Sequence, residues 1–180
     1  MELPKRKTLR LPEYDYSSPG AYFITICTHD RRCILSRITV GAFHETPAVS
    51  LHVTEIGQIV KELIEILPSR YPELAVEHYV IMPNHIHLLL RIDAERALRE
   101  APLLAGESRS LLAKAMGFLK MNSSKQTHQK HPKLELWQRS FYEHVIRNER
   151  DYREIWEYID ANPARWAEDR YYEQMGSVHL

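Results

Sequence analysis

The chain has 180 residues, and its 24 lysines and arginines balance 24 aspartates and glutamates, which leaves a formal net charge of zero. With 44% hydrophobic and 27% charged residues, the composition is that of an ordinary globular protein and excludes a disordered or collagen-like chain. The sequence has no apolar run long enough to span a membrane and no signal peptide, so we expect a cytoplasmic protein without a membrane partner.

The zero net charge conceals an uneven distribution along the chain. Residues 1–40 carry 7 basic against 4 acidic side chains, and residues 108–150 carry 9 against 3. Residues 41–107 carry 5 basic against 10 acidic side chains, and residues 151–180 carry 3 against 7. The two positive segments could bind phosphates locally even though the whole protein is neutral, whereas a solvated basic loop is the simpler interpretation of either segment alone.

The first half of the chain begins with a predicted strand and a predicted helix. Residues 21–28 alternate between apolar and polar or small side chains and are rich in β-branched and aromatic types, as is typical of a strand. Residues 29–53 show a mixed pattern that leaves room for a short hairpin at no definite position. From Thr54, a suitable N-cap, apolar residues recur at helical spacing until Pro68, which we expect to end the helix.

The middle of the chain predicts a hairpin and a second helix. Residues 75–82 and 85–92 are strand-like runs joined only by a proline and an asparagine, so they should pair as antiparallel neighbours. A helix fits residues 108–121, where apolar side chains gather on one side. The polar and basic residues 122–133 that follow are typical of a loop.

The last part predicts a short strand within residues 140–146 and a final helix that closes at Asn162 and Pro163. The resulting order of elements predicts an α+β fold, a ferredoxin-like split βαβ antiparallel sheet with an additional C-terminal helix. We expect a single domain over residues 1–180, with a basic N-terminal arm at 1–15 and a C-terminal tail at 167–180.

Two histidines in the second strand of the predicted hairpin form a candidate metal site. Side chains two positions apart on a strand share one face and lie about 6.6 Å apart along it, so His85 and His87 can converge on one divalent ion. The apolar residues between them point to the opposite face, which helices should cover, and the histidine face should remain open. A purely structural role is the alternative, because a metal site needs a third ligand.

The final helix carries two further candidates, Tyr158 and Asn162. They lie four residues apart, on one face and at the border of the apolar stripe, where both could reach the sheet. An amide oxygen is a suitable ligand for Mg²⁺ or Mn²⁺, and a tyrosine oxygen can act as a nucleophile on a target that a metal polarises. In a chain with ten tyrosines, a packing role for Tyr158 is the alternative.

Three segments resemble one protein family, and they occur in the family's order. YVIMPNHIHLLL is similar to the HUH motif of single-tyrosine HUH transposases. The segment LWQRSFYEHVIRNERDYREIWEYIDANP, at residues 136–163, resembles the nucleophile helix of the REP-associated tyrosine transposase branch of these enzymes. The N-terminal YDYSSPGAYFITICT also resembles that branch, so the similarity runs from about residue 5 to residue 166.

The resemblance implies a role for each candidate residue. It assigns the two HUH histidines to His85 and His87, the catalytic tyrosine to Tyr158, and a third metal ligand to Asn162, where some relatives carry glutamine. It further implies a transposase or nickase with a divalent cofactor, Mg²⁺ or Mn²⁺. Such an enzyme cleaves and rejoins single-stranded DNA at hairpin-associated sites through a 5′-phosphotyrosine intermediate.

The expected partner is therefore single-stranded or hairpin DNA with a REP-like palindrome, which would make the protein nucleoid-associated. The candidate DNA contacts are basic side chains of the two positive segments: Lys5, Arg6, Lys7, Arg10, Lys120, Lys125, Arg139 and Arg147. Both a monomer and a homodimer stay open. Two alternative functions also stay open, namely a non-catalytic hairpin-DNA-binding protein used in host regulation and a metal hydrolase of small phosphoesters.

Overall fold

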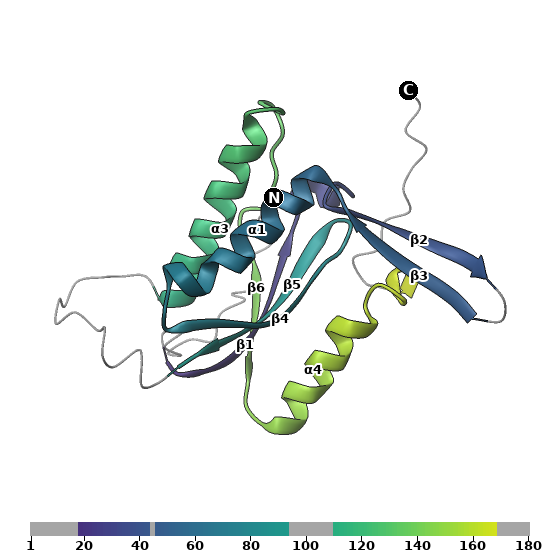
Figure 1. The fold of residues 1–180 in the computed structure, drawn as a ribbon. Helices are drawn as coiled ribbons and strands as arrows, with labels where there is room; N and C mark the ends of the chain where they lie inside the picture. Colours follow the sequence, from purple (N-terminus) through teal and green to yellow (C-terminus); the bar gives the residue numbers. More distant parts are fainter. Residues whose placement is uncertain (1–17, 44–45, 94–109, 169–180) are drawn as a thin grey trace, which may run out of the picture.

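A four-stranded antiparallel sheet with helices on both faces forms the body of the computed structural model, which describes residues 18–43, 46–93 and 110–168 (Figure 1). The strands of this sheet are β1 (Gly20–Cys27), β4 (Leu74–Ile81), β5 (His85–Ile92) and β6 (Tyr142–Ile146). The helices are α1 (Glu55–Arg70), α3 (Leu111–His128) and α4 (Glu149–Ala161).

The order of the strands across the sheet is β4-β5-β1-β6, and each strand is antiparallel to its neighbours. Helix α1 lies between β1 and β4 in the chain, helix α3 connects β5 to β6, and α4 follows as an extra C-terminal helix. This arrangement is the split βαβ sheet of ferredoxin-like folds, so the predicted α+β fold class is confirmed.

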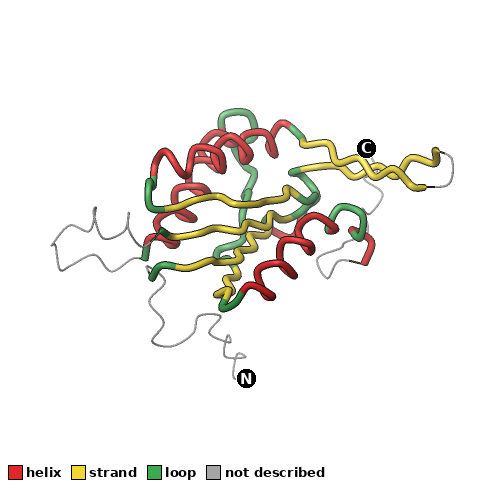
Figure 2. The backbone as a smooth tube through the Cα atoms, turned by 60° about the horizontal axis from the view of Figure 1, so that its bottom comes forward, coloured by secondary structure: helices red, strands yellow, loops and turns green. Residues whose placement is uncertain are grey.

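The two faces of the sheet bury different side chains. One face packs beneath α1 and α3, where Ile24, Leu88 and their neighbours are fully buried in the main core. The other face carries a smaller cluster, in which Phe23 and Leu89 contact Ile159 of α4. Figure 2 shows α4 on the side of the sheet opposite the other two helices. The histidine face, expected to be open, is therefore covered, because the apolar stripe of α4 requires a partner surface.

Helices α1 and α3 both extend beyond their predicted ends. Pro68 lies inside the last turn of α1, where it removes only its own N–H donor, and Tyr71 N–H still bonds to the Leu67 carbonyl. Helix α3 continues to His128, so the loop prediction for residues 122–128 is wrong. Its polar side chains are used internally, since the buried Ser123 hydroxyl accepts a hydrogen bond from Trp137 Nε1 at 2.8 Å.

The mixed segment before α1 forms a separate two-stranded sheet. Strands β2 (Ser36–Phe43) and β3 (Thr46–Val53) pair antiparallel, with Ser36 opposite Val53. This hairpin is longer than the short one expected, and it extends away from the main sheet in both views (Figures 1 and 2). Its length could not be deduced because residues 44–45, which join the strands, carry no turn-forming glycine or asparagine.

The predicted N-terminal arm and C-terminal tail lie almost entirely outside the described residues. The basic arm 1–15 lies outside the described residues, and of the tail only the end of a short helix, η2 (Trp166–Glu168), is described. Within the described ranges, no helix combines the length and the apolar character needed to cross a lipid bilayer.

Gly57 determines how closely α1 approaches the segment before β2. A Cβ atom at this position would lie 2.0 Å from the Leu35 carbonyl oxygen, which accepts hydrogen bonds from Thr54. We expect Gly57→Ala to cost about 1–3 kcal/mol in the free energy of unfolding, because neither backbone can move without losing these bonds. Gly117→Ala, at a helical position with no atom within 4 Å of the added methyl, should instead gain about 0.5–1 kcal/mol.

Calorimetric unfolding of the two glycine variants checks this expectation. A higher thermal midpoint for Gly57→Ala than for the natural protein would contradict the close contact between α1 and Leu35.

Candidate active site

His85 and His87 lie side by side on β5, beneath α4. Both side chains are fully buried, and their Nε2 atoms are 3.0 Å apart. Two ligands at right angles on an octahedral ion with bonds of about 2.1 Å are separated by about 3.0 Å. The distance between the two nitrogens is therefore suited to a single divalent cation.

The other nitrogen of each imidazole, Nδ1, contacts a polar neighbour. Asn84 Oδ1 lies 2.9 Å from His85 Nδ1, and an amide oxygen only accepts, so Nδ1 carries the hydrogen and Nε2 keeps its lone pair. Thr25 Oγ1 lies 2.8 Å from His87 Nδ1. Contacts of this kind orient metal-binding histidines in proteins. Neither residue is among the predicted site residues, although Asn84 directly precedes the first histidine.

Tyr158 brings a hydroxyl group to this pair. Its Oη atom lies 3.3 Å from His87 Nε2, and its ring meets Phe23 edge-on with the centroids 6.0 Å apart. The next residue, Ile159, is buried in the cluster beneath α4, which places Tyr158 at the border of the helix. The tyrosine remains 40% exposed, so its side chain reaches solvent while its hydroxyl group contacts His87.

Asn162 follows one helical turn later and carries an unsatisfied polar atom. The residue is 3% exposed, and its Oδ1 atom has no hydrogen-bond partner among the residues that the structure describes. A buried acceptor without a donor costs about 1–3 kcal/mol, and a water or a cation bound to the amide oxygen would remove this cost. Among the described residues, no three His, Cys, Asp or Glu side chains form a metal-binding group.

Two proteins of Haemophilus influenzae are similar to this chain over most of its length. An uncharacterized protein is 30% identical over 175 residues, which cover 93% of each chain. A second protein, provisionally named a REP-associated tyrosine transposase, is 29% identical over 154 residues, 84% of this chain and 74% of that protein. The chain is therefore similar, over most of its length, to a protein that is named as a REP-associated tyrosine transposase. No protein-family model matches it.

A solved structure shares the fold of this chain. It is the structure of a REP-associated tyrosine transposase bound to a REP hairpin. The TM-score is 0.55 at 21% sequence identity, over 89% of this chain and 77% of that chain. The fold implied by the three sequence motifs is thereby confirmed, and the name of the Haemophilus influenzae relative agrees with the family that the motifs imply.

A β-bulge in the edge strand β4 helps to hold α4. The pairing with β5 shifts by one residue between Val76 and His78, which brings Glu77 into reach of the helix. Glu77 Oε2 accepts a hydrogen bond from Tyr152 Oη at 2.7 Å and another from Arg91 Nη2 at 3.1 Å. Burial and the hydrogen bond to Glu77 raise the pKa of Tyr152, which keeps this hydroxyl a donor at neutral pH.

His78 makes the second contact between the bulge and α4. Its imidazole stacks on Trp156 with ring centroids 4.4 Å apart, and its Nε2 atom lies 2.7 Å from Asp160 Oδ1. Trp156 and Asp160 stand two positions before and two positions after Tyr158. The contact therefore fixes the turn of the helix that presents the tyrosine to the histidines.

The predicted DNA contacts fall into three groups. Lys120 is engaged within the protein, because its ammonium donates to the backbone oxygens of Gln138 and Arg139 at 2.6 and 2.9 Å, and burial lowers its pKa. Three others are exposed on the surface, namely Lys125, Arg139 and Arg147. Four lie outside the described residues, namely Lys5, Arg6, Lys7 and Arg10. None of the described basic side chains joins the histidine–tyrosine group.

We expect His78→Ala to loosen α4 from the sheet. Removing the ring stack and the contact to Asp160 should cost about 1–2 kcal/mol locally, which is about 5–30-fold faster amide exchange in α4. Hydrogen–deuterium exchange followed peptide by peptide measures this effect. Arg150→Ala is the matched control, since it breaks only an exposed ion pair with Glu154 inside the same helix. Equal exchange in both variants would contradict the role of His78.

Proposed function

We propose that this protein cleaves and rejoins single-stranded DNA beside a hairpin and uses Tyr158 as its nucleophile. The observation that supports the proposal is the 3.3 Å distance between Tyr158 Oη and His87 Nε2, next to the 3.0 Å pair of imidazole nitrogens. The hairpin partner is extended to this chain from the solved family member, which is bound to a REP hairpin. The three side chains belong to one chain, so this arrangement needs no second copy.

His85, His87 and Asn162 are the residues that would hold a divalent cation, Mg²⁺ or Mn²⁺. Two imidazole nitrogens at a suitable separation and an unsatisfied amide oxygen are consistent with such an ion. When bound, the ion supplies positive charge for the oxygens of the scissile phosphate and orients the phosphorus for in-line attack.

Tyr158 supplies the attacking oxygen. A free phenol has a pKa of about 10, and a phenol that attacks phosphorus must lose its proton in the step. The Tyr158 Oη–phosphorus bond forms, the bond from phosphorus to the 3′ oxygen breaks, the phenolic proton passes to solvent, and the released 3′ oxygen takes up a proton. The products are a 5′-phosphotyrosine and a free 3′-hydroxyl.

Rejoining follows from the same chemistry in reverse. The phosphotyrosine conserves the phosphodiester, so another 3′-hydroxyl can attack it and release Tyr158 without ATP. Partial exposure of the tyrosine allows a second DNA end to reach the phosphorus. The proposed activity is therefore strand transfer rather than hydrolysis.

A covalent adduct with DNA tests the nucleophile. The substrate is a hairpin with single-stranded flanks, labelled at its 3′ end because the 5′-phosphotyrosine retains the downstream fragment. With Mg²⁺ or Mn²⁺ we expect an adduct that survives denaturing electrophoresis. Tyr158→Phe should abolish the adduct and leave hairpin affinity within about threefold, since one hydroxyl contributes little to binding.

Tyr152→Phe is the matched control for this experiment, because it removes a hydroxyl from the same helix at a residue bonded to Glu77. It should retain the adduct. An equal adduct yield from Tyr158→Phe would contradict the nucleophile assignment. Hairpin binding without any adduct from the natural protein would instead favour the non-catalytic DNA-binding alternative.

The threonine beside His87 provides a separate test of the metal ligands. Thr25→Val removes the oxygen that holds His87 Nδ1, and loss of such a contact typically weakens metal affinity about 10–100-fold. Titration of Mn²⁺ followed by electron paramagnetic resonance measures the change. Thr39→Val, at an exposed position of β2, is the control and should leave the affinity unchanged. Unchanged Mn²⁺ affinity in Thr25→Val would argue against His87 as a ligand.

A further inference from the structure

A basic pocket lies outside the histidine–tyrosine site. It has a volume of about 530 Å³ and is widely open to solvent. Its lining combines cationic side chains with apolar and planar ones, namely Arg32, Lys130, His131, Pro132, Lys133 and Leu134. The volume falls within the range of roughly 300–1,000 Å³ that is typical of small-ligand sites.

Backbone hydrogen bonds place this pocket at the end of the sheet that carries His85. Thr28 directly follows β1, and its N–H bonds to the Asn84 carbonyl at 2.9 Å. The next residue, His29, begins the short helix η1 (His29–Arg31), and its N–H bonds to the Leu136 carbonyl at 2.9 Å. These bonds place the start of η1 between Asn84, which precedes His85, and the end of the segment that lines the pocket.

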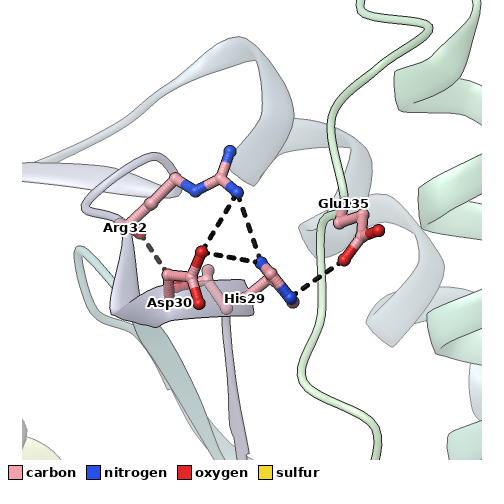
Figure 3. A network of polar contacts seen from close by, with 5 residues as sticks. His29, Asp30, Arg32 and Glu135 are labelled. Atoms are coloured by element: carbon pink, nitrogen blue, oxygen red, sulfur yellow. Dashed lines mark hydrogen bonds and ion pairs between the residues drawn. The ribbon is translucent and has the colours of Figure 1, made fainter.

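A network of side chains holds Arg32 in place (Figure 3). Its Nη2 atom lies 3.2 Å from His29 Nδ1 and 3.5 Å from Asp30 Oδ2, and His29 Nε2 lies 2.9 Å from Glu135 Oε2. Asp30 and Arg31 adopt φ angles of 53° and 52°. This left-handed conformation is unfavourable for residues other than glycine, and such strain persists mainly where the surrounding structure enforces it, often at binding sites.

The pocket keeps positive charge available for a ligand. Lys130 is paired with Glu55 of α1, and its ammonium lowers the pKa of that carboxyl group. Within the part of the chain that the structure describes, no carboxylate pairs with Lys133. Asp30 and Glu135 offset some of the charge, but they are exposed and are bonded to His29.

We propose that this pocket binds one unpaired nucleotide of the DNA strand that flanks the hairpin. The inference rests on the DNA substrate of the proposed function. The ammonium of Lys133 and the guanidinium of Arg32 bind the phosphate, while the base lies against the planar and apolar groups of His131, Pro132 and Leu134. Nonspecific binding of single strands typically combines such cationic contacts with stacking surfaces.

Fluorescence anisotropy with two probes tests the pocket without metal, so that no cleavage occurs. The probes are a labelled oligothymidylate and a labelled blunt-ended hairpin. The double variant Arg32→Ala/Lys133→Ala should bind oligothymidylate about tenfold more weakly or worse, with a shallower salt dependence, and should bind the hairpin within about twofold of the natural protein. Lys61→Ala removes an exposed lysine on α1 and should leave both affinities unchanged.

An abasic oligonucleotide of the same length distinguishes a nucleotide pocket from a site for phosphate alone. The natural protein should bind it about tenfold more weakly than oligothymidylate, whereas the double variant should bind both probes equally. Equal affinity of the natural protein for the two probes overturns the nucleotide assignment. Circular dichroism shows whether the variants are folded, and Arg32→Lys, which keeps the charge but loses the planar group, should bind oligothymidylate with intermediate affinity.

The binding experiments test the proposed nucleotide pocket independently of the proposed cleavage reaction. Unchanged oligothymidylate binding by the double variant overturns the pocket, even if the natural protein forms the covalent adduct through Tyr158. Loss of binding in the double variant supports the pocket, even if no adduct forms.

Discussion

The antiparallel pairing of β1 with β5 determines where every group of the candidate site lies. In this register His87 stands opposite Thr25, and His85 stands opposite Cys27 at the end of the strand. A slip of one residue would exchange the two faces of β5 and bury the apolar side chains beneath the wrong helix. The burial of Leu88 and its neighbours under α1 and α3 therefore fixes the histidines on the opposite face.

The second constraint is the way in which α4 covers that face. Its apolar contact with the sheet is small, and the bulge residues Glu77 and His78 supplement it with polar and ring contacts. This arrangement leaves Tyr158 partly exposed and Asn162 buried with an unsatisfied oxygen. Neither feature favours stability, which is the pattern expected where a fold keeps groups available for a ligand rather than for packing.

The regular spacing of apolar residues along strands and helices made most of the fold predictable, together with the positions of the candidate site residues. Strand alternation gave β1 and β5 their faces, and helical spacing set Tyr158 and Asn162 one turn apart. The rest depends on contacts between distant segments. The bulge at His78 has no sequence signature, Thr25 is found only once the strand register is known, and the extension of α3 requires the segment around Trp137 that satisfies its polar side chains.

In the proposed site, two imidazoles, an amide and a phenol of one chain would surround one cation. A crystal structure with Mn²⁺, located by its anomalous scattering, measures this most directly. We predict one ion bonded to Nε2 of His85, Nε2 of His87 and Oδ1 of Asn162, with the Tyr158 hydroxyl beside it. An ion bound elsewhere, with Tyr158 directed away from the histidines, would contradict the proposed metal site and the role of Tyr158.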